Sequence, residues 1–392
     1  MSNNTQPEIR FPGFTEDWEQ RKLGDFIDVK SGKDYKHLNS GSIPVYGTGG
    51  YMLSVDRALS DIDAIGIGRK GTIDKPYLLK APFWTVDTLF YAVPKQNIDL
   101  QFSLSIFKKI NWKKFDESTG VPSLSKTVIN SVGASVPSYE EQQKIGSFFK
   151  QLDETIALHQ HKLDLLKETK KGFLKKMFPK NGAKVPEVRF PGFTEDWEER
   201  KFFDNIKKTI DFRGRTPKKL GMDWSTSGYL ALSALNVKNG YIDPSADAHY
   251  GDQELYDRWM TGKELYKGQV LLTTEAPMGN VAQVPDNKKY ILSQRTIAFD
   301  VNSDKITDDF LAVLLRSPKS FSELSALASG GTAKGVSQKS LSQFKVILPT
   351  DLDEQFKIGM FFKQLDNTIA LHQRKLDLLK ETKKSFLQKM FV

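Results

Sequence analysis

The chain has 392 residues, enough for two or three domains, and 57 Lys and Arg against 48 Asp and Glu give it a net charge of +9. The absence of cysteine excludes disulfides, thiolate metal ligands and a cysteine nucleophile. The polar first ten residues and the lack of a run of about 18 apolar residues exclude a signal peptide and a membrane span, so we expect a cytoplasmic protein with no membrane partner.

A short motif comes first in chain order. The stretch "RFPGFTEDWEQRK" at 10–22 returns almost unchanged as "RFPGFTEDWEERK" at 189–201. It combines aromatic residues, Pro and Gly with a Thr-Glu-Asp turn. We expect Phe11, Phe14 and Trp18 to anchor the motif against a neighbouring block or helix.

The first variable block, about 23–139, alternates short β-like runs such as "AIGIG" and "LFYAVP" with a helical piece, "LQFSLSIFKKINW". This mixture predicts an α+β domain with a curved sheet and long loops. The segment "GIGRKG" at 66–71 matches the glycine pattern of dinucleotide-binding sites. That pattern requires a following helix, and prolines at 76 and 82 argue against one, so we reject a nucleotide site.

A long helix follows at 141–178, and its sequence returns at 354–391. Apolar residues recur at heptad spacing, which predicts a coiled coil whose partner is the other copy. A compact block between the two copies brings the end of one helix near the start of the other, so we expect antiparallel pairing. The predicted seam consists of Ile145, Phe149, Leu152, Ile156, His159, Leu163 and Leu166, with Ile358, Phe362, Leu365, Ile369, His372, Leu376 and Leu379 in the second copy.

Two histidines occupy seam positions near the helix midpoints, His159 and His372. We interpret them as a polar layer that fixes the register of the pair. A proton switch or a metal site is the alternative, and two histidines alone make a poor metal site.

The second variable block, about 202–351, is longer but has a similar succession of runs, "GYLALSALNV", "GQVLLTT", "TIAFDV" and "FKVILP". The two blocks end alike, which predicts one fold with different loops. The expected organisation is a first domain at 1–140, a spacer helix at 141–178, a linker at 179–187, a second domain at 188–352 and a second spacer helix at 353–392.

Basic and polar residues gather in Gly-rich or Pro-flanked loops of both blocks, where DNA-binding proteins place Arg, Lys, Ser and Gln against bases and phosphates. For each residue alone, a solvent-exposed side chain is the alternative interpretation. The candidate DNA-binding residues are Lys33, Tyr35, Arg69, Lys70, Thr72, Ser125 and Lys126 in the first block, and Arg213, Arg215, Thr216, Lys218, Lys219, Gln294, Arg295, Lys334, Ser337, Gln338 and Lys339 in the second.

We find no catalytic constellation. The Asp/Asn-Pro-Pro-aromatic signature of adenine methyltransferases is absent, as are helicase motifs. Asp164, Glu168 and Lys170 resemble a nuclease triad, but we interpret them as ordinary charges on the surface of the long helix. The sequence therefore predicts no catalytic residue and no metal site.

The paired "RFPGFTEDWE" motifs and the paired "KIG-x-FFKQLD-x-TIALHQ-x-KLDLLKETKK" helices resemble the specificity subunits of type I restriction–modification enzymes over essentially the whole chain. The resemblance implies two target recognition domains, each reading one half of a split, asymmetric DNA site. It also implies a non-catalytic chain that needs no cofactor. Two modification subunits would use S-adenosylmethionine to methylate adenine N6, and two restriction subunits would use ATP and Mg²⁺.

Three other functions are to be compared with this one. A catalytic protein with its own nuclease or methyltransferase activity is disfavoured by the missing motifs. The chain could be a scaffold that joins two protein-binding blocks, or a regulator that binds DNA without partner subunits. A steep fall of DNA affinity with salt would favour DNA binding over a scaffold.

Overall fold

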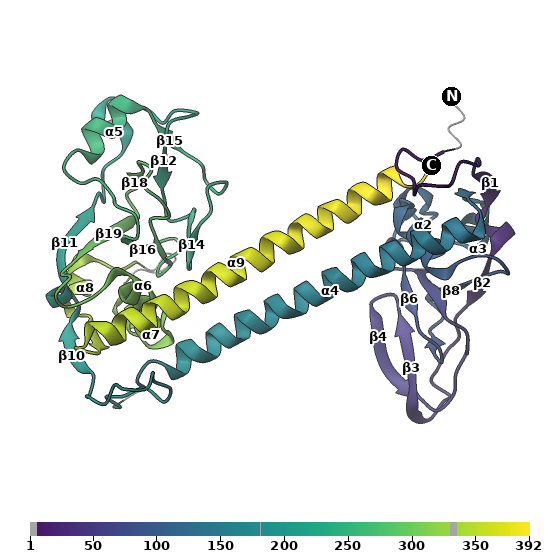
Figure 1. The fold of residues 1–392 in the computed structure, drawn as a ribbon, viewed down its shortest axis with the longest axis horizontal. Helices are drawn as coiled ribbons and strands as arrows, with labels where there is room; N and C mark the ends of the chain where they lie inside the picture. Colours follow the sequence, from purple (N-terminus) through teal and green to yellow (C-terminus); the bar gives the residue numbers. More distant parts are fainter. Residues whose placement is uncertain (1–5, 181, 330–334) are drawn as a thin grey trace. The chain divides into compact units, whose positions relative to one another are not determined.

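The structure is a computed structural model that describes residues 6–180, 182–329 and 335–392. It divides into two compact units. Unit 1 comprises Met1–His161 and Gln373–Val392, and unit 2 comprises Lys162–His372. Each unit therefore contains one variable block together with parts of both long helices (Figure 1).

Unit 1 is built on a four-stranded antiparallel sheet in the order β2-β8-β5-β6. Its two central strands are β5 (Ala64–Gly68) and β8 (Leu89–Pro94), whose uninterrupted apolar runs are largely buried, as expected of strands covered on both faces. The remaining elements are β1 (Glu19–Lys22), α1 (Leu23–Phe26), β2 (Ile27–Ser31), β3 (Ser40–Gly47), β4 (Gly50–Val55), β6 (Tyr77–Leu79), β7 (Trp84–Thr85), α2 (Leu100–Lys109), η1 (Trp112–Phe115), α3 (Lys126–Ser131) and β9 (Gly133–Val136).

Unit 2 repeats this plan with the sheet β11-β19-β16-β17. Its elements are β10 (Glu198–Lys201), η2 (Phe202–Asn205), β11 (Ile206–Asp211), η3 (Pro217–Leu220), β12 (Tyr229–Leu232), β13 (Val237–Lys238), β14 (Tyr241–Ile242), β15 (Tyr250–Gly251), α5 (Gln253–Met260), β16 (Val270–Thr273), β17 (Val281–Gln283), β18 (Ile291–Leu292), β19 (Thr296–Val301), α6 (Asp308–Arg316), α7 (Pro318–Leu327), α8 (Gln338–Gln343) and β20 (Lys345–Leu348).

The smaller sheets of the two units match as well. The order β4-β3-β7 in unit 1 corresponds to β15-β12-β18 in unit 2, and in both the third strand runs parallel to the middle one. The pairs β1-β9 and β10-β20 also correspond. The structure thus confirms a duplicated α+β fold. The extra length of unit 2 includes α5 and the β13-β14 hairpin.

The helices α2 and α6 occupy equivalent places and start in the same way. Asp99 caps α2 by accepting a hydrogen bond from the backbone N–H of Phe102, and Thr307 caps α6 by accepting one from Phe310. Such caps satisfy N–H groups that the first turn of a helix leaves without partners. Both helices therefore begin at a fixed point against the long helices.

The long helices α4 (Tyr139–Lys176) and α9 (Leu352–Lys389) have 38 residues each. In unit 1 the first part of α4 contacts the last part of α9, with Phe148 and Phe386 5.0 Å apart between ring centroids. In unit 2 the end of α4 contacts the start of α9, with Phe173 and Phe361 also 5.0 Å apart. The pairing is therefore antiparallel within each unit.

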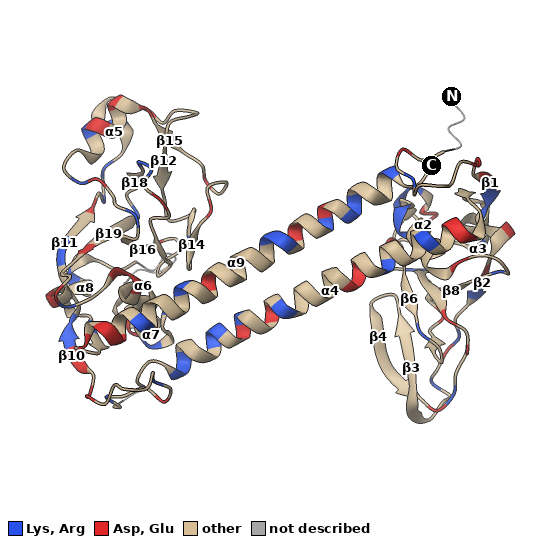
Figure 2. Ribbon diagram, viewed as in Figure 1, with Lys and Arg blue, Asp and Glu red and all other residues tan. Residues whose placement is uncertain are grey.

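The predicted seam residues all have little exposure. Those buried are Ile145, Phe149, Leu163, Ile358, Phe362 and Leu376, and those half-buried are Leu152, Ile156, His159, Leu166, Leu365, Ile369, His372 and Leu379. Charged residues of both signs also lie along both helices (Figure 2). The role of the two histidines as a register-fixing layer stays a prediction. Among the helices of the described chain, none is long and apolar enough to cross a membrane.

Candidate nucleic-acid interface and helix anchors

Most of the predicted DNA-binding residues of unit 1 lie at one edge of its four-stranded sheet. β2 and β5 end there and β8 begins there, because Ser31 pairs with Phe90 and Gly68 with Leu89. The loops that leave this edge carry Lys33, Tyr35, Arg69, Lys70 and Thr72.

The segment before α3 joins the same edge. The backbone N–H of Gly71 donates to the carbonyl of Pro122 at 2.8 Å, and that of Leu124 donates to Arg69 at 2.9 Å. These bonds bring Ser125 and Lys126 beside the loop that carries Arg69.

Glycine is required where the first of these loops turns. A Cβ on Gly32 would lie 2.0 Å from the carbonyl oxygen of Val86, so only glycine lets the two loops pass. The next residue, Lys33, is exposed, whereas Tyr35 is half-buried against the cluster around Trp84. Ser125 accepts a hydrogen bond from the N–H of Val128 as the cap of α3. Tyr35 and Ser125 therefore shape the edge as well as lining it.

Unit 2 has an equivalent edge. β11 and β16 end there and β19 begins there, because Asp211 pairs with Ile297 and Thr273 with Thr296. The loops at this edge, together with η3 and the start of α8, carry Arg213, Arg215, Thr216, Lys218, Lys219, Gln294, Arg295, Ser337, Gln338 and Lys339. Lys334 lies outside the described residues.

Several of these side chains already have partners. Arg215 lies over the rings of Phe212 and Trp259, 5.1 and 5.7 Å from their centroids. Arg295 forms an ion pair with Glu275 at 2.9 Å. Thr216 and Ser337 cap η3 and α8. The edge of unit 2 is thus held by side-chain contacts as well as by backbone pairing.

The repeated short motif anchors the start of each long helix. In unit 1, Arg10 donates from Nε and Nη2 to the two carboxylate oxygens of Glu141, both at 2.8 Å, and Glu141 is 1% exposed. In unit 2, Arg189 makes the same pair of bonds to Glu354 at 2.6 and 2.8 Å. Because charge-assisted bidentate pairs are among the strongest hydrogen bonds, they fix the motif on the helix.

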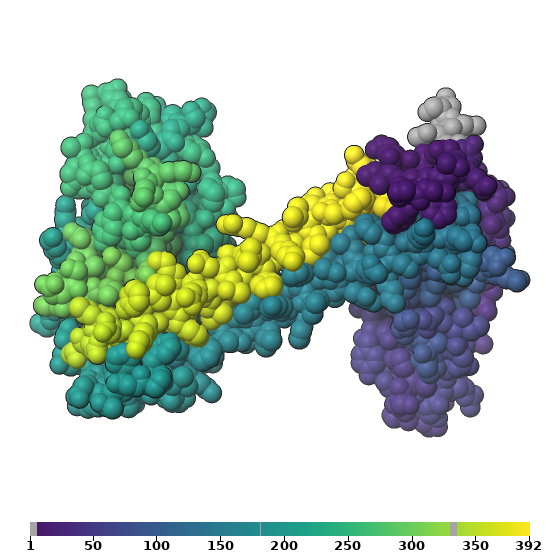
Figure 3. Space-filling model, viewed as in Figure 1, coloured from purple at the N-terminus to yellow at the C-terminus, as the bar shows by residue number. Residues whose placement is uncertain are grey.

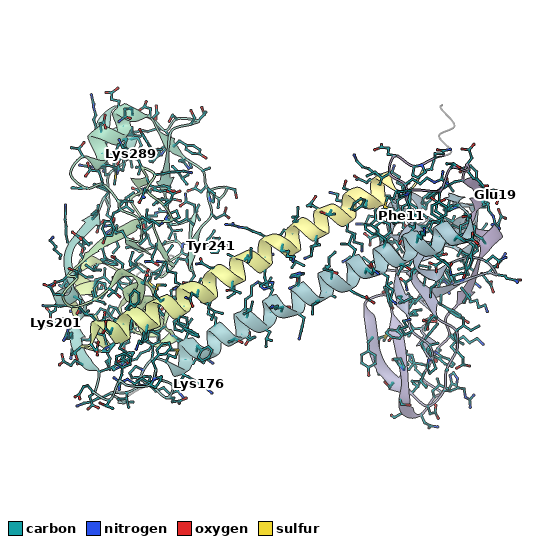
Figure 4. The ribbon with its side chains drawn as sticks, viewed as in Figure 1. Phe11, Glu19, Lys176, Lys201, Tyr241 and Lys289 are labelled. Atoms are coloured by element: carbon teal, nitrogen blue, oxygen red, sulfur yellow. The ribbon has the colours of Figure 1, made fainter. Side chains whose placement is uncertain are left out.

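The same motif also holds the end of the other long helix. In unit 1, the N–H of Ile9 donates to the carbonyl of Lys389, and the buried ring of Trp18 contacts Phe391. Figure 3 shows the first described residues (purple) lying beside the end of α9, and Figure 4 labels Phe11 there. The predicted packing of Phe11 and Trp18 is confirmed, because Phe11 contacts Phe148 and Trp18 contacts Phe391.

Unit 2 repeats this contact position by position. The N–H of Val188 donates to the carbonyl of Lys176 at 2.9 Å, and Trp197 contacts Phe178. In each unit, the duplicated motif therefore contacts the start of one long helix and the end of the other.

The residues after the anchoring glutamate fix the block on the helix. The buried side chain of Gln142 accepts from the N–H of Asp99 and donates to the carbonyl of Pro137. One turn later, a Cβ on Gly146 would lie 2.2 Å from the carboxylate of Asp99. In unit 2, Gln355 makes the equivalent hydrogen bonds, and Gly359 lies equally close to the start of α6. Sequence reasoning missed these roles, although their near-verbatim repetition was a signal.

A bridging aspartate joins three helices in each unit. In unit 1, Asp153 of α4 pairs with Lys108 of α2 at 2.8 Å and with Lys383 of α9. Burial raises the pKa of Asp153, but the two ammonium groups outweigh burial and its net pKa is lowered.

In unit 2, Asp366 pairs with Arg316 at 2.6 Å and with Lys170 at 2.5 Å. The interpretation of Lys170 as an ordinary surface charge was wrong, because its side chain is 19% exposed and bridges two helices. Burial, followed by the nearby Arg316, lowers the pKa of Lys170. Among the described residues, no group of three or more His, Asp or Glu side chains could hold a metal ion.

These features define a class of proteins with two tandem, duplicated binding domains carried on a pair of long helices. The family described as "Type I restriction modification DNA specificity domain" matches residues 15–168 and 194–381. The chain therefore belongs to this family, and it carries two DNA specificity domains.

Named relatives agree with this assignment. The chain is 24% identical to the MjaVIII type I restriction enzyme specificity subunit of Methanocaldococcus jannaschii, over 95% of this chain and 91% of that protein. It is 23% identical to the putative MjaX specificity subunit of the same organism, over 95% and 92%. The crystal structure of the type I S subunit from M. genitalium shares the fold, with a TM-score of 0.71, 13% identity and 99% of each chain covered.

Proposed function

We propose that the chain is the non-catalytic, DNA-reading subunit of a type I restriction–modification complex, and that each unit binds one half of a split, asymmetric target. The observation that carries the proposal is the pair of equivalent sheet edges. Both units project basic and polar loops from the same place in the same fold, but the side chains differ. One scaffold with two different loop sets suits the reading of two different half-sites.

We further propose that partner subunits perform the chemistry. Two modification subunits would use S-adenosylmethionine to methylate adenine N6, and two restriction subunits would use ATP and Mg²⁺ to translocate and cleave DNA. No cofactor is assigned to this chain.

The exposed surfaces of the long helices support the proposal that two identical partner subunits bind. Large apolar side chains are exposed at the same repeat positions: Leu158 and Leu378 in unit 1 are 65% and 66% exposed, and Leu165 and Leu371 in unit 2 are 59% and 64% exposed. Exposed apolar residues that recur in both copies are typical of an interaction surface. We assign them to the modification subunits, since two identical copies must dock alike.

The test is a genome-wide map of N6-methyladenine in cells that express this chain with its modification subunit, compared with cells that lack the chain. We expect a split, asymmetric motif only when the chain is present. If the two proteins form a complex but no such motif appears, the chain is not the specificity determinant.

A further inference from the structure

Three positions at the two sheet edges are equivalent. The last residues of β2 and β11 both pair with the second residue of the partner strand, β8 and β19, so they correspond, and so do the residues two places later. The helices α3 and α8 each begin directly after a serine cap, so their first residues correspond as well. The three positions hold Ser31, Lys33 and Lys126 in unit 1, and Asp211, Arg213 and Gln338 in unit 2.

In unit 2 one carboxylate joins the other two side chains. Oδ2 of Asp211 accepts from Nε of Arg213 at 2.8 Å and from Nε2 of Gln338 at 3.0 Å. Its Oδ1 accepts from the backbone N–H of Arg213 at 2.9 Å, and the Asp211 side chain is only 8% exposed. The carbonyl of Val336 accepts from Nη1 of Arg213 at 3.0 Å. Both side chains are therefore held in place before any ligand arrives.

This arrangement leaves hydrogen-bonding groups unused. Nε, Nη1 and Nη2 of Arg213 each donate once, which leaves two of its five N–H groups. Gln338 keeps its amide oxygen and one N–H. In the major groove of DNA, an arginine binds the two acceptors of guanine, and a glutamine binds the acceptor and donor of adenine. Side chains fixed in advance lose less conformational entropy on binding.

The equivalent groups of unit 1 are not arranged in this way. Lys33 is exposed and Lys126 is half-buried, and neither ammonium group has a hydrogen-bond partner within the described part of the chain. An ammonium group on a flexible stem acts as a point charge, which suits a phosphate more than the edge of a base.

We propose that Arg213 and Gln338 read base edges in the half-site of unit 2, and that Asp211 is the residue that positions them. At the equivalent places of unit 1, Lys33 and Lys126 bind phosphates and read no base. The inference rests on the proposed function, because it assumes that each unit binds half of a DNA site.

The experiment uses the complex of the full chain with its modification subunit to select DNA from a randomised duplex library. The variants are Gln338→Ala, Arg213→Lys and Asp211→Asn, and the melting temperature of each is measured alongside. We expect each variant to lose discrimination by about tenfold or more at one or two positions of one half-site. The other half-site should keep its sequence.

Matched variants in unit 1 are Lys33→Ala and Lys126→Ala. Each should weaken binding to all sequences alike, with an unchanged motif and a salt dependence reduced by about one ion. A change in the preferred bases of either variant would contradict the assignment to phosphate.

The outcomes separate the inference from the proposed function. If the unaltered complex selects no split motif, the proposed function fails. If it selects one and Gln338→Ala, which changes an exposed side chain, leaves every base preference intact, the inference fails alone. If Asp211→Asn weakens binding to all sequences equally, Asp211 is not a positioning residue for base readout.

Discussion

Arg10 and Arg189 lie in the repeated motif and are the only cations that contact Glu141 and Glu354 among the ion pairs of the described residues. Removal of one partner of a buried ion pair leaves a charge with neither water nor a counter-ion, which costs about 3–5 kcal/mol. We expect Arg10→Ala to lower the free energy of unfolding by this amount in urea titrations.

The control for Arg10→Ala is Lys113→Ala. Lys113 pairs with Asp74 on the surface, with 72% of its side chain exposed, so its removal should change the stability far less than that of Arg10. Equal losses for the two variants would show that the buried pair has no special importance.

Two glycines of α4 allow a second comparison at the scale of single residues. Gly146 lies against Asp99, whereas a Cβ on Gly172 would meet nothing within 4 Å. We expect Gly146→Ala to destabilise the protein by about 1–3 kcal/mol through overpacking. Gly172→Ala should stabilise it by about 0.5–1 kcal/mol, because alanine favours the helix. Thermal unfolding measures both, and the same sign for both would contradict the packing of α2 on α4.

Asp308 makes the stability of unit 2 depend on pH. Burial raises its pKa to about 6, although Tyr266 donates a hydrogen bond to it. The folded state therefore holds a proton more tightly than the unfolded state, in which aspartates have a pKa of about 3.9. Stability from this group is present at low pH and is lost as the pH rises from about 4 to 6.

Asp308→Asn should remove this loss. We expect the variant to gain about 1–2 kcal/mol at pH 8 and little at pH 4, after allowance for the favourable position of Asp308 at a helix start. Urea titrations at the two pH values provide the measurement. A larger gain at pH 4 than at pH 8 would contradict the sign of the pKa change.

For single residues, the sequence predicts burial in the long helices well but does not predict long-range side-chain contacts. The heptad pattern predicts which side chains of α4 and α9 are buried, because burial follows from periodicity. The links of Asp211 with Arg213 and Gln338 join residues up to 127 positions apart, and no local pattern indicates them. Lys170 was misinterpreted for the same reason, since its partners come from other helices.

At the scale of helices and strands, the two blocks share one fold although their sequences show little similarity. Their equivalent strands have the same order and pairing, but the sequences between the repeated motifs differ. The fold class was predictable from short β-like runs and from similar block endings. The convergence of the loops at one sheet edge was not, because it depends on which strands are neighbours.

The exposed leucines of the long helices provide the prediction at this scale. Leu158→Ser with Leu378→Ser in unit 1 removes two exposed apolar side chains, so the stability of the chain should change by less than about 0.5 kcal/mol per site. Binding of the modification subunit should weaken by about tenfold or more, measured by calorimetry. A control double variant at two exposed lysines of the same helices, Lys162→Ser in unit 2 with Lys375→Ser in unit 1, should bind normally, and equal weakening by both would contradict a leucine-based contact.

At the scale of the whole molecule, the strand equivalences define a graft. Lys22 and Lys201 end β1 and β10, and Val136 and Leu348 end β9 and β20. Replacement of 202–348 by a second copy of 23–136 gives a chain with two identical blocks on unchanged helices. We expect its methylated motif to consist of two half-sites with the same sequence.

The control is the chain with its own two blocks, mapped in the same cells. Retention of the original asymmetric motif by the graft would show that the second block does not choose its half-site. Loss of all methylation despite a folded complex would show that the blocks are not interchangeable on the helices.

The division of the chain has a consequence for its synthesis. Unit 2 is one continuous stretch, whereas unit 1 needs 373–392 to complete its core around Trp18 and Phe391. A ribosome adds about 5–20 residues per second, so about 10–40 seconds separate the first part of unit 1 from the segment that closes it. During this delay the apolar surface that 373–392 will cover stays exposed, and unit 2, whose last residue is His372, is complete before unit 1 is. The half of the molecule that is made first is therefore completed last, and nascent chains should depend on chaperones mainly through unit 1.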